Sequence, residues 1–447
     1  MRRRLFGVVG ILAALLLIAA AEPETRLEQY QRLRQEAAAA VKAGDLATAE
    51  GKLTTALELY PDVPGSYIRL ARVLAAEGKL DKALICVEVY ADTGLTYDVA
   101  ADSALKVLIG RPDFAPIAAR MAKNAEPAGG GFSADWALDA EPTFIAEGIV
   151  KDGDTWLVSG VASRSILRLS LTATTETGRS GLTSTPYLTP DDDTGALFGM
   201  AIDRPRGVLW VAEAWGDGVP GTSGESKAAL LKVSLKTGKV LARFFVATDG
   251  GKHQLGDVTV AGDGTVYASD GVSGGIYRLR AGSPKLELLV KPGAMASPQG
   301  LVICPGDFAM VVADYSTGLH RVNLATGETA LISGGSIGLA GTDGMILLNR
   351  APTGDLTLAL SQNGVSPQRV VSVSLDGSCS TFRGSRLVAA NLPGMDDLTL
   401  LAADGDYLML VSHSRWEARD QEGKLTRPDP GPVRFRRTEW TGWSPVG

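Results

Sequence analysis

The sequence predicts a multidomain chain in which an all-α segment of helical repeats precedes an all-β six-bladed propeller. Two observations predict this order. Residues 24–125 are rich in Ala and Leu and show no strand alternation. The C-terminal two thirds then repeats one pattern six times: a short loop, a hydrophobic strand, a turn, and a second strand rich in Val, Trp and Tyr. A repeat of roughly 40–60 residues with three or four strands is typical of a propeller blade.

The first 21 residues have the layout of an export signal. Residues 2–4 are arginines, and an uncharged apolar run from Leu5 to Ala21 follows them. The alanines at 19–21 supply the small residues that a cleavage site requires. The run is also nearly long enough to remain as a membrane anchor. We therefore expect residues 1–21 to be a signal peptide or an uncleaved anchor. The rest of the chain would then be periplasmic or secreted, or membrane-anchored if the segment is retained.

Residues 24–125 contain two copies of a helical pattern. Gly44-Asp45-Leu46 with Ala49 aligns with Gly78-Lys79-Leu80 with Ala83. Each glycine is expected to end one helix at a tight turn, and each alanine to let the next helix approach closely. A degenerate third copy after residue 93 would cap the stack. The period and the small/large pattern resemble the tetratricopeptide repeat (TPR). This resemblance implies either a concave groove for a peptide or protein partner, or a packing module beside the propeller.

The boundaries of the propeller follow from composition. Residues 126–131 include Pro127 and three glycines, which predicts a flexible linker. The six repeats then place the propeller at 132–415. The tail, 416–447, contains the apolar and basic stretch from Val433 to Trp440, which could form a strand that closes the ring.

The loops that open the six repeats are the place to look for function, because the first strands of the blades surround one central channel. Glu147 and Asp343 open two repeats, Asp396 or Asp397 opens another, and Asp257 is a further candidate. Carboxylates crowded at a narrow mouth repel one another, and a bound divalent cation would relieve that repulsion. Alternatively, each acid caps a turn by accepting backbone N–H groups.

These loops resemble those of the SMP-30/gluconolactonase family of six-bladed propellers, over about residues 140–415. Four segments carry the resemblance: Glu147-Gly148 matches Glu-Gly-Pro of the first blade, Leu255-Gly256-Asp257 matches Asn-Asp-Gly of the third, Ser297-Pro298-Gln299-Gly300-Leu301 matches Pro-Asn-Gly-Leu of the fourth, and Thr342-Asp343-Gly344-Met345 matches Pro-Asp-Gly-Met of the fifth.

The resemblance implies one divalent cation, Ca²⁺ before Mg²⁺, Mn²⁺ or Zn²⁺, held by Glu147, Gln299 and Asp343. Asp343 would also be the catalytic general base in the hydrolysis of a small lactone or ester. Gln299 departs from the family's Asn, and Gly256 lacks the family's third-blade side chain.

Three further residues are expected to bind substrate at the same mouth: Asp257, Asp397 and His253. His253 lies just before the third opening loop, so its side chain could reach the mouth and relay a proton.

Charge and cysteine content restrict the partners. The formal net charge of −6 argues against nucleic acid, which normally needs a basic patch. The three cysteines, Cys86, Cys304 and Cys379, make no disulfide framework. Pairing of Cys304 with Cys379 is open, but we expect all three to be buried small apolar residues.

Two functions remain open from the sequence. One is a metal-dependent hydrolase of a small molecule at the propeller mouth, based on Glu147 and Asp343. The other is a non-catalytic propeller that binds a ligand or protein, with the helical repeats as a second docking surface. The changes at Gly256 and Gln299 favour this second function.

Overall fold

The structure is a computed structural model that describes residues 23–172, 181–334, 337–420 and 423–440. The expected signal peptide, 1–21, lies outside the described residues. In the ranges that are described, no helix is both long and apolar enough to cross a membrane.

The N-terminal segment is helical, as predicted. Thr25 begins the first helix with a capping box: its Oγ1 accepts from the Glu28 N–H at 3.1 Å, and Glu28 Oε2 accepts from the Thr25 N–H at 2.8 Å. The α-helices are α1 (Arg26–Ala43), α2 (Leu46–Leu59), α3 (Pro64–Ala76), α4 (Leu80–Asp92) and α5 (Ala115–Asn124), with short 3₁₀ turns at Lys106–Leu108 and Pro112–Phe114.

The repeat pattern has a structural basis in these helices. Gly44 and Gly78 follow α1 and α3 with φ angles of 78° and 77°, a left-handed conformation that favours glycine. Ala49 and Ala83 are fully buried, where helices approach one another. The likeness of this segment to the tetratricopeptide repeat remains a prediction.

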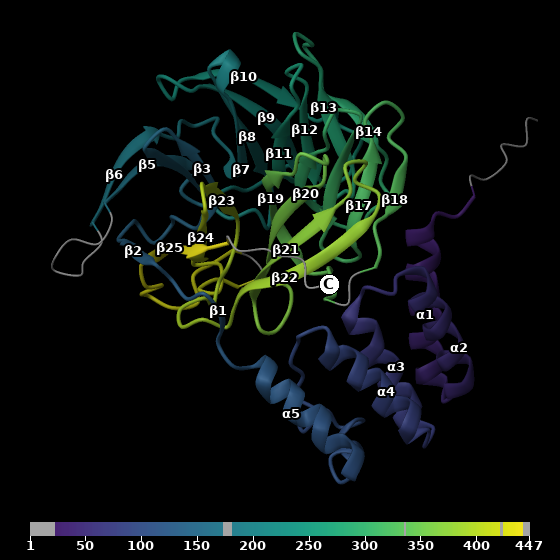
Figure 1. Ribbon diagram of the computed structural model, residues 1–447. Helices are drawn as coiled ribbons and strands as arrows, with labels where there is room; N and C mark the ends of the chain where they lie inside the picture. The colour runs from purple at the N-terminus through teal and green to yellow at the C-terminus, as the bar shows by residue number, and fades with distance from the viewer. Residues whose placement is uncertain (1–22, 173–180, 335–336, 421–422, 441–447) are drawn as a thin grey trace, which may run out of the picture.

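The β-strands form six antiparallel sheets around a ring, so the prediction of a six-bladed propeller is confirmed (Figure 1). The first strands of neighbouring blades contact one another around the ring. The first five blades consist of β3 (Ala146–Asp152), β4 (Thr155–Gly160), β5 (Ser165–Thr172) and β6 (Gly181–Leu188); β7 (Ala196–Asp203), β8 (Val208–Trp215), β9 (Lys227–Ser234) and β10 (Val240–Phe245); β11 (Leu255–Val260), β12 (Val266–Asp270), β13 (Ile276–Leu279) and β14 (Glu287–Val290); β15 (Pro298–Ile303), β16 (Ala309–Asp314), β17 (Gly318–Asn323) and β18 (Thr329–Leu331); and β19 (Thr342–Arg350), β20 (Leu356–Gln362), β21 (Arg369–Leu375) and β22 (Phe382–Ala390).

The sixth blade joins the two ends of the propeller. It consists of β23 (Leu401–Asp404), β24 (Tyr407–His413), β25 (Val433–Glu439) and, outermost, β2 (Ala134–Leu138). Trp136 on β2 lies opposite Phe435 on β25, and both side chains are buried. The ring therefore includes residues beyond 415, the end expected from the sequence, and the C-terminal strand closes it.

The segment expected to be a flexible linker also takes part in a blade. Its residues Ala128–Gly129 form β1, which pairs with the outer edge of β22. Linker composition did not reveal this pairing, because a two-residue strand leaves no periodic signal in the sequence.

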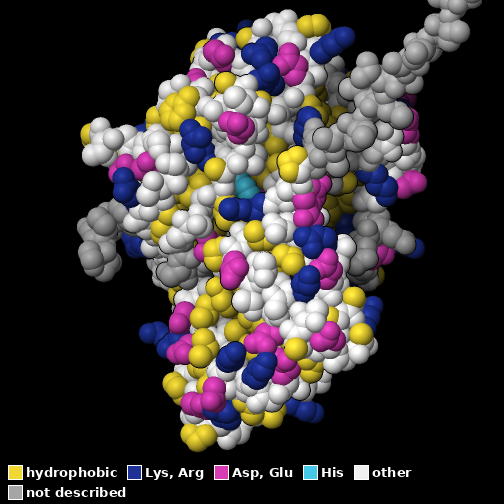
Figure 2. Space-filling model, turned by 90° about the vertical axis from the view of Figure 1, so that its right-hand side faces the viewer, with side chains coloured by type: hydrophobic (Ala, Val, Ile, Leu, Met, Phe, Trp, Pro, Cys, Tyr) yellow, Lys and Arg dark blue, Asp and Glu magenta, His cyan; other side chains and the backbone are white. Residues whose placement is uncertain are grey.

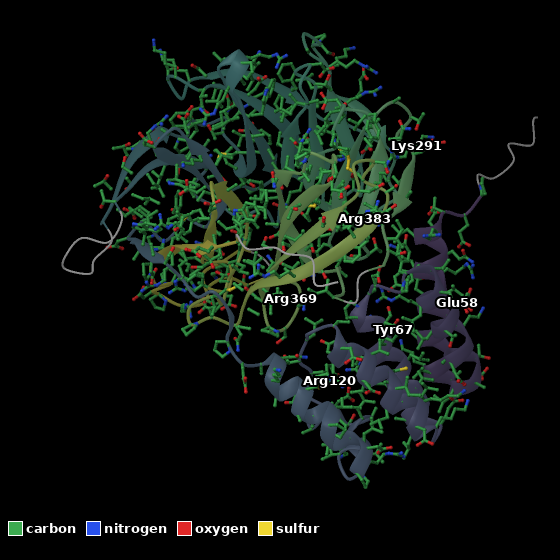
Figure 3. The ribbon with its side chains drawn as sticks, in the orientation of Figure 1. Glu58, Tyr67, Arg120, Lys291, Arg369 and Arg383 are labelled. Carbon is green, nitrogen blue, oxygen red and sulfur yellow. A yellow bond between two sulfur atoms is a disulfide. The ribbon has the colours of Figure 1, made fainter. Side chains whose placement is uncertain are left out.

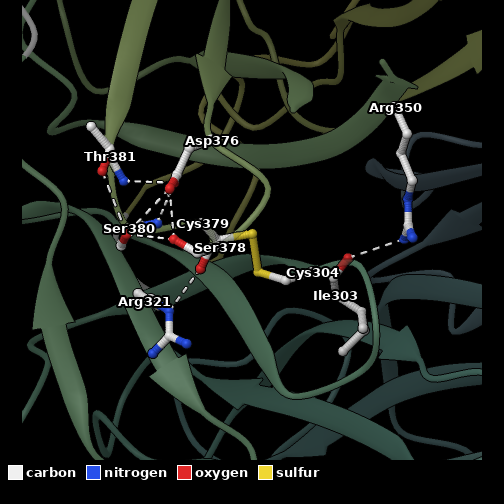
Figure 4. The surroundings of a disulfide bond; sticks show 9 residues. All are labelled: Ile303, Cys304, Arg321, Arg350, Asp376, Ser378, Cys379, Ser380 and Thr381. Carbon is white, nitrogen blue, oxygen red and sulfur yellow. Dashed lines mark hydrogen bonds between the residues drawn. A yellow bond between two sulfur atoms is a disulfide. The ribbon is translucent and has the colours of Figure 1, made fainter. Parts of the chain in front are cut away.

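The prediction that all three cysteines remain unpaired is wrong for two of them. Cys304 and Cys379 form a disulfide with a Cα–Cα distance of 6.3 Å, joining blades four and five (Figure 4). Cys304 follows β15, at the strand's far end from the opening loop, and Cys379 lies in the turn from β21 to β22. Packing of two neighbouring blades brings together residues 75 apart in sequence, which spacing alone could not indicate. Cys86 is free and buried, as expected.

The helices pack against the propeller on one side (Figure 1). Leu27, Tyr30, Tyr60 and Val63 form a buried cluster with Ala340 of the loop before β19. At the edges of this contact, Thr25 Oγ1 donates to the Gly293 carbonyl at 2.7 Å, and the Thr96 N–H donates to the Ser366 carbonyl at 2.8 Å.

A buried arginine fastens the two parts together. Arg369 begins β21 and is only 2% exposed, on the side of the propeller that faces the helices (Figure 3). Its Nη1 donates to the Thr93 carbonyl at 2.7 Å, its Nε to Gln362 Oε1 at 2.8 Å, and its Nη2 to the carbonyls of Ile337 and Gly338. Burial lowers the pKa of Arg369 to about 10.

Candidate functional site

The six opening loops converge on one cavity of about 390 Å³ at the mouth of the channel. Every blade contributes to its wall. The lining includes Glu147, Phe198, Gly256, Asp257, Ser297, Gln299, Asp343, Asp397, Leu398 and Leu400 from the opening loops, and Gln254, Tyr315, Asn363, Gln368 and Trp416 around them.

A local irregularity of the first strand turns these side chains toward the channel. In blades one to five, the pairing register of the first strand shifts at the opening residues. Such bulges re-aim side chains and are common beside functional sites. Serines at the end of the second strands satisfy the N–H groups that the shift leaves unpaired: Ser159 Oγ accepts from Gly148 at 2.8 Å, Ser269 Oγ from Asp257 at 3.0 Å, and Ser361 Oγ from Gly344 at 3.0 Å.

Four acids from four blades line this cavity: Glu147, Asp257, Asp343 and Asp397. Each has one main hydrogen-bond partner. Trp416 Nε1 donates to Glu147 Oε2 at 2.6 Å, Asn363 Nδ2 to Asp343 Oδ2 at 2.7 Å, the Val258 N–H to Asp257 Oδ1 at 3.0 Å, and the Glu417 N–H to Asp397 Oδ2 at 3.5 Å. The described lining includes no Lys, Arg or His.

Desolvation disfavours the charged forms of three of these acids, Glu147, Asp257 and Asp343. Burial raises the pKa of Glu147 well above its usual range, and the charges of Asp343, Asp257 and Asp397 raise it further, while the Trp416 hydrogen bond opposes them. Burial, with the charge of Asp343, raises the pKa of Asp257 to about 7. Burial also raises the pKa of Asp343, against the hydrogen bond from Asn363. The charged forms of these acids therefore have no compensating basic side chain among the described residues of the lining.

Gln299 lines the cavity with Glu147 and Asp343, so the three residues expected to hold a cation come together at one cavity. Its Nε2 donates to Ser297 Oγ at 3.1 Å. A Cβ added to Gly256 would lie 3.0 Å from Gln299 Oε1, so the glycine leaves room for the longer amide.

The structure places His253 outside the cavity. Its Nδ1 lies 2.7 Å from Asp270 Oδ2 and its Nε2 lies 3.0 Å from Asp249 Oδ1, and the ring is buried. Burial lowers the pKa of His253, but the hydrogen bonds with Asp249 and Asp270 raise it more, for a net increase. Its neighbour Gln254 lines the cavity instead. The two carboxylates therefore hold the imidazole away from the cavity, and the expectation that His253 binds substrate there is not met.

The choice between Asp396 and Asp397 is settled by burial. Asp397 is 5% exposed and lines the cavity. Asp396 points outward, where its Oδ1 lies 3.1 Å from His413 Nδ1.

Sequence reasoning missed Trp416 and Asn363, which hold Glu147 and Asp343. Trp416 lies in the segment assigned to the tail, and no repeat pattern marks it. Asn363 follows the second strand of blade five. A serine recurs near the end of the second strand in several blades, and this recurrence could have identified the strand ends as part of the site.

The carboxylates alone do not form a metal site. Among the described residues, no group of three or more His, Cys, Asp and Glu side chains could hold a metal ion. A cation here would need amide oxygens as well, which Gln299 and Asn363 can supply. An all-oxygen set of this kind suits Ca²⁺, Mg²⁺ or Mn²⁺ better than Zn²⁺, which prefers nitrogen and sulfur. The buried, unpaired Oδ1 of Asn363 fits such a set.

Comparison with known protein families finds no match for the chain, and comparison with curated proteins also finds none. Solved structures give weak likenesses. A calcium-binding protein, regucalcin, from Agrobacterium tumefaciens is 17% identical with a TM-score of 0.42, and the match covers 70% of this chain and 96% of that one. A PQQ-bound aldose sugar dehydrogenase from Streptomyces coelicolor is also 17% identical, with a TM-score of 0.40 and coverage of 70% and 99%.

A third likeness is to virginiamycin B lyase from Staphylococcus aureus, at 11% identity and a TM-score of 0.40, covering 68% of this chain and 98% of that one. At these identities and scores, none of the three likenesses supports a conclusion about activity. The interpretation of the site therefore rests on its own residues.

Proposed function

We propose that this chain binds one divalent cation, preferably Ca²⁺, at the propeller mouth and hydrolyses a small lactone or ester there. One observation carries the proposal: carboxylates from four blades share a cavity whose described lining has no basic side chain. Buried carboxylates are costly unless a cation compensates them. A cavity of about 390 Å³ suits a small molecule.

The residues of the mouth divide into ligands and their supports. Glu147, Gln299 and Asp343 would hold the cation, and the indole of Trp416 fixes one carboxylate oxygen of Glu147. When bound, a divalent cation supplies polarisation of an ester carbonyl and lowers the pKa of a bound water.

Proton transfer falls to the acids that line the same cavity. Asp343 is oriented by Asn363, and its raised pKa brings it closer to neutrality, where a general base is most effective. Asp257, with a pKa of about 7, can exchange a proton with substrate or water at neutral pH. Asp397 completes the wall on the blade-six side.

Elemental analysis of the purified full chain tests the proposal. After dialysis against Ca²⁺ and Mn²⁺, we expect one metal ion per chain, absent from both Glu147→Ala and Asp343→Ala. The loaded protein is then screened against small lactones and esters with a pH-stat. Metal without hydrolysis would favour the alternative function, a non-catalytic ligand-binding propeller. Absence of metal, or equal metal in both variants, would contradict the proposal.

Export to the periplasm or beyond is part of the same proposal. The Cys304–Cys379 disulfide supports it, because such bonds persist in oxidising compartments and are rare in the cytosol. Fractionation of cells that express the full chain, with mass spectrometry of its N-terminus, would test both export and cleavage after residue 21. A cytosolic chain with reduced cysteines would contradict it.

The helical segment favours a second function, the capture of an acidic peptide. A groove of about 920 Å³ runs along α1 and α3, lined by apolar residues such as Val41, Leu46 and Leu53. Its charged lining residues are all basic: Arg34, Lys42, Arg69 and Arg72. Only Arg72 has an acidic partner among the described residues, Asp102 at 2.7 Å.

This charge pattern, like the TPR resemblance, supports a peptide that carries carboxylates and apolar side chains. Burial and the charge of Arg34 lower the pKa of Arg69, so an anion in the groove would be favoured. Fluorescence anisotropy of a labelled acidic, apolar peptide against the full chain tests this. Equal affinity for a basic peptide of the same hydrophobicity would contradict it.

A further inference from the structure

We propose that Asn363 is an additional ligand at the mouth, so that the cation is held by two amide oxygens as well as by carboxylates. The inference rests on the proposed function and deepens it. Asn363 belongs to neither the motif of the opening loops nor the first strands. It follows β20, the second strand of blade five, and reaches the cavity from the side.

The orientation of the Asn363 amide is fixed by two acceptors. Its Nδ2 donates to Asp343 Oδ2 at 2.7 Å and to the Leu398 carbonyl at 2.9 Å. A backbone carbonyl cannot donate, so the nitrogen must face Leu398. Both amide hydrogens are therefore used, and Oδ1 is held in the remaining direction.

That oxygen is buried and has no hydrogen-bond partner. Leaving a buried acceptor unpaired costs about 1–3 kcal/mol, so such atoms in a folded protein call for an explanation. Asn363 lines the cavity with Glu147, Gln299 and Asp343. A cation bound there would give Oδ1 the partner that the protein does not supply, and amide oxygens are ordinary Ca²⁺ ligands.

The neighbouring loop shows why an extra amide is useful. Gly256 contributes no side chain to the third-blade position of the cavity. Gln299 leans into the space that is left, with its Oε1 3.0 Å from where a Cβ of residue 256 would be and its Nε2 2.7 Å from that of Gly271. Gln299 of blade four thus reaches into the space that blade three leaves open, and Asn363 adds a second amide on the blade-five side of the cavity.

Terbium luminescence with the full chain tests the assignment. Tb³⁺ replaces Ca²⁺ at oxygen sites, and Trp416 beside Glu147 can sensitise its emission. Decay rates in H₂O and D₂O count the waters on the ion. If Asn363 is a ligand, Asn363→Ala should weaken Tb³⁺ binding at least tenfold and add one coordinated water.

Asn363→Asp separates a ligand from a positioning residue. It keeps a side-chain oxygen at the site but loses both N–H donors to Asp343 and Leu398. A ligand role predicts affinity equal to or tighter than wild type, because the substitution adds negative charge. A purely positioning role predicts that Asp and Ala weaken binding alike, with no added water. Circular dichroism of both variants verifies that the blades remain folded.

The outcomes distinguish this inference from the function on which it rests. If the wild type binds neither Tb³⁺ nor Ca²⁺, the cation site fails, and the role of Asn363 with it. If the wild type binds and Asn363→Ala leaves affinity and hydration unchanged, the assignment of Asn363 is overturned while the proposed site stands. Equal weakening in both variants without an added water also overturns it.

Discussion

The propeller mouth and the groove of the helices present opposite charges on one chain. The mouth gathers Glu147, Asp257, Asp343 and Asp397 without a basic side chain in its described lining. The groove gathers Arg34, Lys42, Arg69 and Arg72 without an acidic one. Elsewhere charges are mixed, and Figure 2 shows basic and acidic side chains interspersed over the side that it views. A net charge of −6 therefore describes neither site, and we propose that the two take ligands of opposite sign.

The contrast arises from different physical origins. At the mouth, six loops meet on one axis, so side chains that are far apart in sequence become neighbours. In the groove, the basic residues come from two helices that are close in the sequence, α1 and α3, and these helices bring them to one surface. Desolvation raises the pKa values of Glu147, Asp257 and Asp343 at the mouth, whereas Arg69 and Arg72 of the groove are exposed to solvent.

The largest effect is expected from Asp343, one of the acids that line the mouth. Asp343→Ala removes a proposed cation ligand and the acceptor for Asn363 Nδ2, and we expect cation affinity to fall at least 100-fold by calorimetry. Asp396→Ala is the matched control, because this neighbouring acid points outward toward His413. The control should bind as the wild type does. Equal losses in both variants would show that the mouth is not the site.

The next effect concerns the link between the two regions. Arg369→Met leaves the carbonyls of Thr93, Ile337 and Gly338 without their donor. We expect the free energy of unfolding to fall by about 2–4 kcal/mol, measured in urea. Limited proteolysis should also cleave between the helices and the propeller sooner than in the wild type. Arg383→Ala, an exposed position on β22, serves as the control. Unchanged stability in Arg369→Met would mean that the apolar cluster alone holds the parts together.

A smaller effect follows from the raised pKa of Asp257, about 7 in the folded protein against 3.8 ordinarily. The folded state holds a proton that the unfolded chain releases, so this group's contribution is most favourable below pH 4 and is lost as pH rises toward 7. Each unit corresponds to about 1.4 kcal/mol, and solvent in the open mouth reduces the total. In chelator, Asp257→Asn should therefore be more stable than wild type at pH 8 by about 1–3 kcal/mol.

Urea unfolding at pH 5 and pH 8 measures this difference. The advantage of the variant should shrink at pH 5, where wild-type Asp257 is mostly protonated. An advantage that is the same at both values would show that the carboxyl titrates normally.

The sequence predicted the strands and loops that recur in every blade, and it missed site residues that occur only once. Six recurrences of strand and loop predicted the blades, and the opening loops predicted that Glu147, Gln299 and Asp343 would face one channel. Trp416 and Asn363 escaped because each appears once, outside the repeated loop. His253 was placed wrongly because proximity in sequence to a mouth loop does not fix the direction of a side chain, which Asp249 and Asp270 decide.

Contact between neighbouring blades explains one further miss. The bond between Cys304 and Cys379 joins blades four and five, and the two residues lie together only because these blades pack side by side. Local patterns carry no information about such contacts, whereas they carry a great deal about turns such as those at Gly44 and Gly78.

The smallest effect is expected in the groove, where one charge of several is removed at an accessible surface. Arg69→Ala should weaken binding of an acidic, apolar peptide about three- to tenfold, because Arg69 lines the groove without an acidic partner among the described residues. Arg32→Ala is the control: Arg32 also lies on the helices, but it pairs with Glu24 and Glu36 outside the groove lining. Anisotropy at low and at 0.5 M salt measures both. Equal weakening in the two variants would show that only the overall charge of the chain matters. A loss of affinity that is confined to Arg69→Ala and becomes smaller at 0.5 M salt would show that the groove binds the peptide through its basic side chains, in contrast to the acidic mouth.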